Sequence, residues 1–223
     1  MLEEMAAFFA ARLAGYDEHM RRDIEGAAEF YPFTASLLPR SPEAALLDLG
    51  CGTGLELEEY YRLGGEARVT GIDLSADMLA ALAAKFPGRK LTLLQGSYLE
   101  LPLGEDCYDA AVSVESLHHF PAETKRTLYE RLYRALRPAG FFVLTDYFAA
   151  SEAEERAFFA ELAALRATEG PAEDGTLVHF DTPLTVDHEA ALLREAGFPT
   201  VRDLRRWGAT HTLLASKKHY DYG

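Results

Sequence analysis

The stretch LLDLGCGTGLELEEYY, Leu46–Tyr61, changes character at its midpoint, and it decides how the rest of the chain is interpreted. Its short apolar run is typical of a strand that is buried on both faces of a sheet. The run ends in glycines at alternate positions, Gly50, Gly52 and Gly54, and a charged helical pattern follows. Glycines at such a turn permit positive φ angles and let backbone amides approach a ligand without a Cβ in the way. The stretch therefore predicts a ligand-binding loop between a buried strand and a helix.

Strand and helix signals alternate after this point, which predicts a parallel sheet with helices on both faces. The helices have recognisable ends, with Ser75 as one N-cap and Pro121 in the first turn of another that stops at Pro138. The end of the chain predicts two strands joined by a tight turn at 207–209, hence an antiparallel hairpin. We expect an α/β fold with a Rossmann-like, doubly wound mixed sheet of about seven strands, the last strand antiparallel. The five strands expected before the hairpin are Ala45–Leu49, Arg68–Asp73, Leu91–Gln95, Asp109–Val114 and Gly140–Tyr147.

Two parts of the chain are not needed for this alternating unit. Residues 1–44 predict helices that cap the ligand edge of the sheet. Residues 148–186 predict a lid insertion: Ser151 and Glu154 give a capping-box signature for a helix to about Thr168, and a long irregular loop follows. A further helix from about Val186 to Ala196, closed by Gly197, leads back to the sheet. We expect one domain over residues 1–223, with the cap and the lid as parts of it.

Composition and charge limit the class of protein, its cellular location and its binding partners. The chain has 48% hydrophobic and 26% charged residues, which is typical of a globular protein, and no apolar segment is long enough to span a bilayer. The first residues carry acid where a signal peptide carries base, so we expect a cytoplasmic protein without membrane contact. The two cysteines, Cys51 and Cys107, make no disulfide framework. The formal net charge of −14 argues against nucleic acid, because phosphate attraction cannot drive binding over the surface as a whole.

Three classes of ligand compete for the glycine loop. A P-loop needs Lys and then Ser or Thr after its last glycine, but Leu55 and Glu56 follow here. A dinucleotide fingerprint needs a further glycine at position 55 or 57, and both positions are Leu. The remaining class of ligand is a nucleoside without phosphates. Asp73, at the end of the next strand and about 20 residues beyond the glycines, stands where a carboxylate can accept hydrogen bonds from both ribose hydroxyls.

The motifs LLDLGCGTG and GIDLSADML resemble those of class I S-adenosylmethionine-dependent methyltransferases of the small-molecule type, and LRPAGFFVLTDYF resembles the family's fifth-strand motif. The resemblance covers roughly Tyr31–Lys218. It implies an enzyme that binds S-adenosylmethionine and transfers the methyl group to a small-molecule acceptor by in-line displacement. The implied cofactor-binding residues are Tyr16, Asp48, Gly50, Cys51, Gly52, Gly54, Asp73, Leu74, Met78, Ser97, Tyr98 and Glu115.

The resemblance also implies a role for several of these residues. Asp48 and the glycines would shape the pocket for the methionine part, Asp73 would hold the ribose, and Met78 would pack beside the adenosine. Ser97 and Tyr98 would border the adenine. The family commonly has Asp where Ser97 stands, and a hydroxyl accepts a hydrogen bond more weakly than a carboxylate.

Three further positions near the cofactor have less specific roles. Glu115 would place its charge near the cofactor's ammonium or sulfonium. Tyr16, in YDEHM, resembles N-terminal segments that fold over the cofactor, where an aromatic face attracts a cation. Cys51 is expected as a small packing residue and not as a nucleophile.

Adjacent histidines in SVESLHHF are the candidate catalytic residues. His118 and His119 follow the fourth strand and could act as general base, which is needed only if the acceptor keeps its proton at neutral pH. The alternative for each is a structural histidine that is satisfied by the backbone. Together with Glu115 they also suggest a metal site. Adjacent histidines rarely face one ion, however, and the sequence identifies no third ligand, so we predict no metal.

Two other functions stay open at this point. One is modification of tRNA, for which Arg202, Arg205 and Arg206 are the basic residues at hand. The other is S-adenosylmethionine binding by a regulatory module without turnover, because fold does not fix function. The oligomeric state, monomer or homodimer, stays open. The acceptor chamber is expected to be apolar and acidic, which favours a cationic or amine-bearing acceptor.

Overall fold

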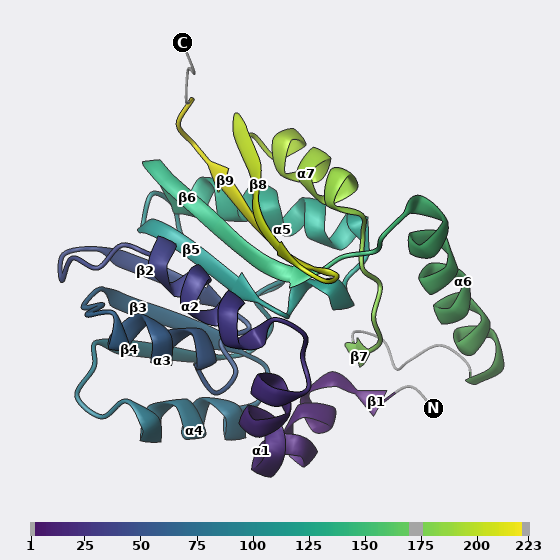
Figure 1. Cartoon of the computed structure of the whole chain (residues 1–223), viewed down its shortest axis with the longest axis horizontal. Helices are drawn as coiled ribbons and strands as arrows, with labels where there is room; N and C mark the ends of the chain where they lie inside the picture. Colours follow the sequence, from purple (N-terminus) through teal and green to yellow (C-terminus); the bar gives the residue numbers. More distant parts are fainter. Residues whose placement is uncertain (1–2, 170–175, 220–223) are drawn as a thin grey trace.

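The computed structural model describes residues 3–169 and 176–219, and a seven-stranded sheet with the order β4-β3-β2-β5-β6-β9-β8 forms its centre (Figure 1). The strands from β4 to β6 pair in parallel, and β9 is antiparallel to both of its neighbours. The predicted mixed, doubly wound sheet is confirmed. The strands are β2 (Ala45–Leu49), β3 (Arg68–Asp73), β4 (Leu91–Gln95), β5 (Tyr108–Val114), β6 (Leu136–Tyr147), β8 (Thr200–Trp207) and β9 (Thr210–Ser216).

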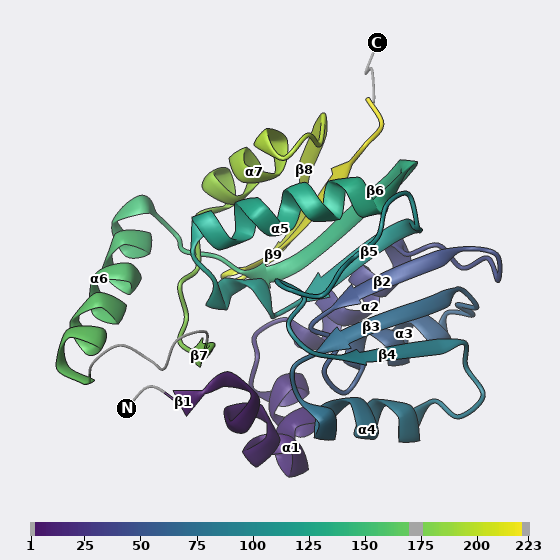
Figure 2. The same cartoon turned by 180° about the vertical axis from the view of Figure 1, so that it is seen from behind.

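Helices cover both faces of the sheet, as Figures 1 and 2 show from opposite sides. The helices α2 and α3 lie on one face, and α5 and α7 lie on the other. Within the described residues, no helix combines the length and the apolar character that a bilayer crossing requires. The helices are α1 (Met5–Arg22), α2 (Ala27–Leu37), α3 (Leu55–Arg62), α4 (Ala76–Lys85), the 3₁₀-helix η1 (Leu117–His119), α5 (Ala122–Ala135), α6 (Glu152–Glu169) and α7 (Val186–Glu195).

Side-chain hydrogen bonds explain where the helices begin. Ser75 Oγ accepts from the amide of Met78 at 3.3 Å, as its predicted N-cap role requires. Ser151 Oγ accepts from the amide of Glu154 at 3.2 Å, and the Glu154 carboxylate accepts from the amide of Ala150 at 2.6 Å. This is the reciprocal pattern of a capping box, with the return bond moved by one residue. The predicted starts of α4 and α6 therefore follow from local chemistry.

The structure differs from the prediction between α5 and β6. The helix ends at Ala135 and not at Pro138, and β6 begins at Leu136 and not at Gly140. Leu136 pairs with Tyr108, and the register then shifts before the regular ladder resumes. Pro138 lies in this irregular part, where its missing N–H disrupts no ladder bond. The chain thus passes from helix to strand without an intervening loop.

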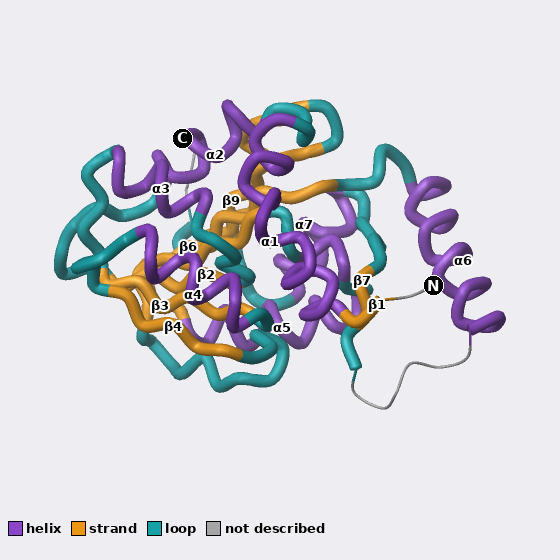
Figure 3. Tube along the Cα trace, turned by 90° about the horizontal axis from the view of Figure 1, so that it is seen from below, coloured by secondary structure: helices purple, strands orange, loops and turns teal. Residues whose placement is uncertain are grey.

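A second, two-stranded sheet was not predicted. The strands β1 (Glu3–Glu4) and β7 (Val178–His179) pair antiparallel, with Glu3 opposite His179. They join the start of α1 to the segment that follows α6. Figure 3 shows α1 crossing the end of the large sheet, with β1, β7 and the outlying helix α6 to one side.

The two helices of the predicted N-terminal cap, α1 and α2, lie in different places. α2 packs on the sheet, where Thr34 Oγ1 lies 2.5 Å from Thr145 Oγ1 of β6. α1 lies at the carboxyl ends of the parallel strands instead.

In the predicted lid insertion, residues 170–175 lie outside the described residues, and the lid role of the segment stays a prediction.

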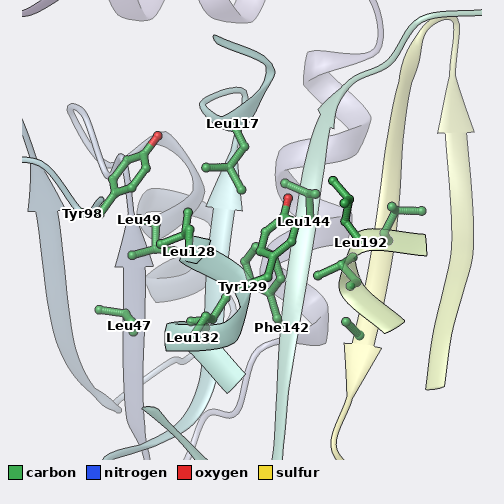
Figure 4. Packing of buried hydrophobic residues seen from close by; sticks show 14 of the residues in the cluster. Leu47, Leu49, Tyr98, Leu117, Leu128, Tyr129, Leu132, Phe142, Leu144 and Leu192 are labelled. Atoms are coloured by element: carbon green, nitrogen blue, oxygen red, sulfur yellow. The ribbon is translucent and has the colours of Figure 1, made fainter. Parts of the chain in front are cut away.

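A buried ion pair joins α5 to α7 inside one hydrophobic layer. Figure 4 shows this layer, in which Leu128 and Leu132 of α5 meet Leu47 and Leu49 of β2. Within it, Lys125 Nζ donates to Glu189 Oε2 at 2.6 Å, and the two side chains are 2% and 0% exposed. The hydroxyl of Tyr129 also donates to Glu189. The pair therefore has the hydrogen bonds that a buried charge requires.

Lys125→Met should lower the free energy of unfolding by about 3–5 kcal/mol, because Glu189 would stay buried without its cation. The double variant Lys125→Met, Glu189→Leu should recover most of this loss, since both charges are then removed. Urea unfolding at neutral pH measures both effects. Arg156→Ala, which breaks an exposed ion pair with Glu152, is the matched control and should cost less than about 1 kcal/mol. Equal effects for Lys125→Met and Arg156→Ala would contradict the prediction.

Candidate functional site

The glycine loop after β2 is bound to the end of β3 by backbone hydrogen bonds. The amides of Gly50 and Cys51 donate to the carbonyl of Ile72 at 2.9 and 3.2 Å. The amide of Gly52 donates to Asp73 Oδ2 at 2.9 Å. The loop therefore has a fixed position relative to the carboxyl ends of two neighbouring strands.

Gly50 and Gly52 are needed for different reasons, although both have positive φ, at 74° and 46°. A Cβ at Gly50 would lie 2.2 Å from the hydroxyl of Ser116, so this glycine permits close packing inside the protein. A Cβ at Gly52 would meet nothing closer than the hydroxyl of Tyr16, at 3.8 Å. Gly52 is therefore the position where the backbone is bare toward open space.

Asp73 lies at the end of β3 with both carboxylate oxygens on backbone donors. Oδ2 accepts from Gly52, and Oδ1 accepts from the amide of Ser75 at 2.8 Å. Burial raises the pKa of Asp73, and the hydrogen bonds from Ser75 and Gly52 oppose that rise. Each oxygen has a second lone pair, so the carboxylate can still accept from ligand hydroxyls.

Two adjoining cavities open at this edge of the sheet. The first, here called the glycine-side cavity, has a volume of about 40 Å³. The second, the α1 cavity, has about 650 Å³ and lies along α1. Both are lined by Phe9, Tyr16, Glu115 and His119, so these four side chains form the boundary between them. The glycine-side cavity is lined by Met5, Phe9, Tyr16, Gly50, Gly52, Asp73, Leu74, Met78, Tyr98, Glu115, Ser116 and His119.

Helix α1 is held over the glycine loop by polar contacts of Asp17. Thr53 Oγ1 donates to Asp17 Oδ1 at 2.5 Å, and Lys85 of α4 donates to the other oxygen. One turn further along, Arg21 forms an ion pair with Glu58 of α3 at 2.7 Å. A space of about 40 Å³ holds only a few water molecules, so this is a closed arrangement.

The structure brings most of the predicted binding residues together. Tyr16, Gly50, Gly52, Asp73, Leu74, Met78, Tyr98 and Glu115 all line the glycine-side cavity. Ser97 lies outside it, because its hydroxyl accepts from the amide of Leu99 in a turn. Cys51 packs beneath the loop, where its sulfur would lie 2.8 Å from a Cβ at Gly71, and Gly54 packs against Leu82 and Phe86.

Asp48 also lies outside both cavities, next to the carboxyl group of Glu56. Asp48 Oδ2 and Glu56 Oε1 are buried without hydrogen-bond partners. Burial raises the pKa of both groups, and the negative charge of Glu56 raises that of Asp48 further. The pair is therefore an electrostatically unfavourable feature behind the glycine loop, which a nearby cation would relieve.

Glu115 has a strained backbone at the boundary of the two cavities. Its φ is 48°, which non-glycine residues rarely adopt, and strain of this kind is often found at functional sites. Thr210 donates to Glu115 Oε1 at 3.0 Å. Burial and then the charge of Asp146 raise the pKa of Glu115 to about 7.

The two candidate histidines differ in their partners. His118 Nδ1 lies 2.5 Å from Asp146 Oδ1, and this carboxylate raises the pKa of His118 to about 9 although burial acts in the opposite direction. His119 Nδ1 lies 3.1 Å from Asp181 Oδ1. Burial and the positive charge of His118 lower the pKa of His119 to about 4. His119 lines both cavities, whereas His118 lines the α1 cavity.

Several lining residues were missed at the sequence level. Ser116, whose hydroxyl lies 2.9 Å from that of Tyr98, directly follows Glu115 and could have been found as the next residue after the strand. Met5 and Phe9 depend on which face α1 turns inward, and Asp181 depends on a chain reversal more than 60 residues after the histidines. For these three the sequence offers no local signal.

Comparison with known proteins gives consistent descriptions. A family described as a methyltransferase domain matches residues 46–140. A sterol 24-C-methyltransferase of Gibberella zeae is 26% identical over 86% of this chain and 48% of its own length. An O-methyltransferase of Penicillium expansum is 29% identical over 70% of this chain and 52% of its own length. The chain thus spans about half the length of these curated relatives.

Solved structures show the same fold at low sequence identity. Human N-acetylserotonin methyltransferase, in complex with S-adenosylmethionine, superposes with a TM-score of 0.61 at 19% identity, over 86% of this chain and 52% of that one. A 1,6-didemethyltoxoflavin-N1-methyltransferase of Burkholderia thailandensis has a TM-score of 0.62 at 23% identity, over 96% of this chain and 88% of that one.

Gly50→Ala should destabilise the protein more than Gly64→Ala. Both positions have positive φ, at 74° and 81°, so each Ala costs about 1–2 kcal/mol through the backbone. The Cβ at position 64 meets nothing within 4 Å, whereas that at position 50 collides with Ser116. The collision should add about 1–3 kcal/mol. Urea unfolding of both variants measures the difference, and equal losses would disprove the packing role of Gly50.

Proposed function

We propose that this chain, which belongs to the class I S-adenosylmethionine-dependent methyltransferases, binds that cofactor at the glycine-side cavity and methylates a small-molecule acceptor in the α1 cavity. One observation carries the proposal. The bare backbone of Gly52 and the carboxylate of Asp73 meet at the cavity that adjoins the larger one. A nucleoside held there would have its far end next to space for a second molecule.

The groups present match the parts of the cofactor. Asp73 offers carboxylate lone pairs for ribose hydroxyls, and Leu74, Met78 and Tyr98 offer apolar surface for a purine. The bare backbone at Gly52 suits the close approach of the methionine part. The strongly acidic surroundings suit a molecule that carries both an ammonium and a sulfonium.

Binding requires α1 to move. The closed glycine-side cavity of about 40 Å³ is far smaller than an adenosyl group, and Tyr16 lies across it. Opening breaks the contacts of Asp17 with Thr53 and Lys85 and the ion pair of Arg21 with Glu58. It also uncovers Met5 and Met20 of α1, which are buried in the closed form. The strands of the large sheet keep their pairing, so the movement is a local opening and not an unfolding.

When bound, the cofactor supplies a methyl group on a positively charged sulfur, so the leaving group is already activated. The protein then has to align the two molecules and exclude water. Phe9 and Tyr16 form part of the boundary at which the two molecules would meet, and both come from α1. Closure of α1 is therefore the step by which this chain would orient the acceptor.

The α1 cavity has the properties of a small-molecule site. Its volume of about 650 Å³ lies in the range typical of such pockets, and Phe8, Met20 and Ile24 give it an apolar wall. Glu115 and His119 are the ionisable groups at the boundary. An acceptor with an exchangeable proton could pass it to Glu115 or to His119. His118 does not suit this role, because its raised pKa of about 9 leaves it protonated at neutral pH.

Other assignments have less support. The arginines considered for tRNA lie on β8, where Arg205 pairs with Glu29 and Arg206 donates to the carbonyl of Gly208. Arg205 and Arg206 therefore contact the protein's own surface. A regulatory module without turnover is distinguished by incubating the protein with methyl-labelled cofactor and a metabolite extract: transfer of label supports the enzyme, and tight binding without transfer supports the module.

Asp73→Ala should weaken binding of S-adenosylhomocysteine by about 5- to 150-fold, equivalent to 1–3 kcal/mol, because ribose hydroxyls lose their acceptor. Isothermal titration calorimetry measures the change. Asp203→Ala, which removes a carboxylate paired with His211 on the far hairpin, is the control and should bind as the parent chain does. Equal affinity of the two variants would refute the assignment of Asp73.

Gly52→Ala should reduce cofactor affinity strongly, while Gly64→Ala should not. Both substitutions place a Cβ at positive φ, so their backbone strain is similar. Only the first Cβ enters the glycine-side cavity. For the parent chain, cofactor at 100 times its dissociation constant should raise the free energy of unfolding by about 2.7 kcal/mol. Thermal unfolding with and without the cofactor measures both effects; loss of the shift in Gly64→Ala, or its persistence in Gly52→Ala, would contradict the proposal.

A further inference from the structure

Three potential metal-ligating atoms converge on the wall of the α1 cavity. They are His118 Nε2, His119 Nδ1 and Asp181 Oδ1, and all lie within 4.8 Å of one another. His119 Nδ1 is 3.1 Å and His118 Nε2 is 3.7 Å from Asp181 Oδ1. Ligands at about 2.0–2.2 Å from one ion lie about 3.0–3.4 Å apart when they subtend 90–110°. The two measured separations therefore lie within this range or a few tenths of an ångström beyond it.

Within the described part of the chain, two atoms of this cluster have no hydrogen-bond partner outside it. His119 Nδ1 and Asp181 Oδ1 are buried atoms 3.1 Å apart, and among the described residues neither has a hydrogen-bond partner outside the cluster, although the Asp181 side chain as a whole is 44% exposed. The His119 side chain is 5% exposed. Buried polar atoms without a partner are rare and are explained by a role such as ion binding. The two atoms therefore point to a ligand between them.

Residues around the cluster hold its members in position. Asp146 Oδ1 lies 2.5 Å from His118 Nδ1, which leaves Nε2 directed at the cluster. A carboxylate on the far nitrogen of a ligating histidine is the usual support of a metal site, because it fixes the tautomer and the ring. The amide of Thr182 donates to the carbonyl of His118 at 2.7 Å, and this bond positions the neighbouring Asp181.

We propose that His118, His119 and Asp181 bind a divalent transition-metal ion at the wall of the α1 cavity. Two imidazoles and one carboxylate suit Zn²⁺, Mn²⁺ or Fe²⁺ better than Mg²⁺ or Ca²⁺, which prefer oxygen ligands. Three protein ligands leave coordination positions free, and all three residues line the α1 cavity. The sequence alone predicted no metal, because Asp181, the third candidate ligand, comes from a distant segment.

The site also indicates a class of acceptor, and this step rests on the proposed function. A free coordination position facing the cavity would take an oxygen of the bound acceptor. A coordinated hydroxyl loses its proton more readily and is therefore a better nucleophile at neutral pH. The proton would pass to the carboxylate of Glu115, the oxygen would take the methyl group, and the cofactor would leave as the neutral thioether. We therefore expect a hydroxyl-bearing acceptor, preferably one with a second oxygen close enough to chelate the ion.

Titration of the chelator-treated full chain with ZnCl₂ and with MnCl₂ tests the site. Calorimetry should show one ion per chain for at least one metal, and elemental analysis after dialysis should agree. Asp181→Ala and His119→Ala should each weaken binding by about tenfold or more. His211→Ala is the matched control, because His211 and Asp203 form a His–carboxylate pair at 2.8 Å elsewhere on the surface. It should bind the ion as the parent chain does.

Two further measurements separate the possible failures. Co²⁺ bound to the parent chain should give visible absorption typical of histidine ligation, which needs no variant to fold. Absence of this signal together with absence of Zn²⁺ and Mn²⁺ binding, or equal binding by the parent chain and Asp181→Ala, overturns the metal site. S-adenosylhomocysteine affinity is measured on the same samples. If the chain binds S-adenosylhomocysteine but no metal ion, only the metal site is refuted. If it binds a metal ion but no S-adenosylhomocysteine, the proposed function is refuted.

Discussion

The hydrogen bond from the amide of Gly52 to Asp73 is the constraint on which the site depends. It joins the loop after β2 to the end of β3 at 2.9 Å, and it fixes the bare backbone beside the buried carboxylate. Parallel pairing of these strands places both ends at one edge of the sheet. The position of Glu115 follows from the next neighbour, β5, in the same way. Sheet topology thus assembles chemistry from segments that are distant in the sequence.

Much of this arrangement was predictable because it rests on local signals. Apolar runs and glycines located β2 and its loop, and Ser75 marked the start of α4. The resemblance of LLDLGCGTG and GIDLSADML to class I methyltransferases agrees with the methyltransferase-domain family that matches residues 46–140. Other parts depend on tertiary contacts. The two-residue strands β1 and β7 have no periodicity to detect, and the approach of Asp181 to His119 exists only after the chain folds back.

Negative charge is concentrated at this edge of the sheet as well as on the surface. Asp48, Glu56, Asp73 and Glu115 are all buried or nearly so, and burial raises the pKa of each. Such a group of acids is unfavourable in an empty protein and becomes favourable beside cations. The proposed cofactor and the proposed ion are both cationic, so each would relieve part of the same electrostatic cost.

The position of α1 has a kinetic consequence. Because Asp17 holds α1 against Thr53 and Lys85, the closed form has to open before a ligand enters or leaves. The apparent affinity is then lower than the intrinsic affinity by the fraction of molecules that are open. Association should therefore be slower than an unobstructed encounter, and both exchange rates should rise when the Asp17 contacts are weakened.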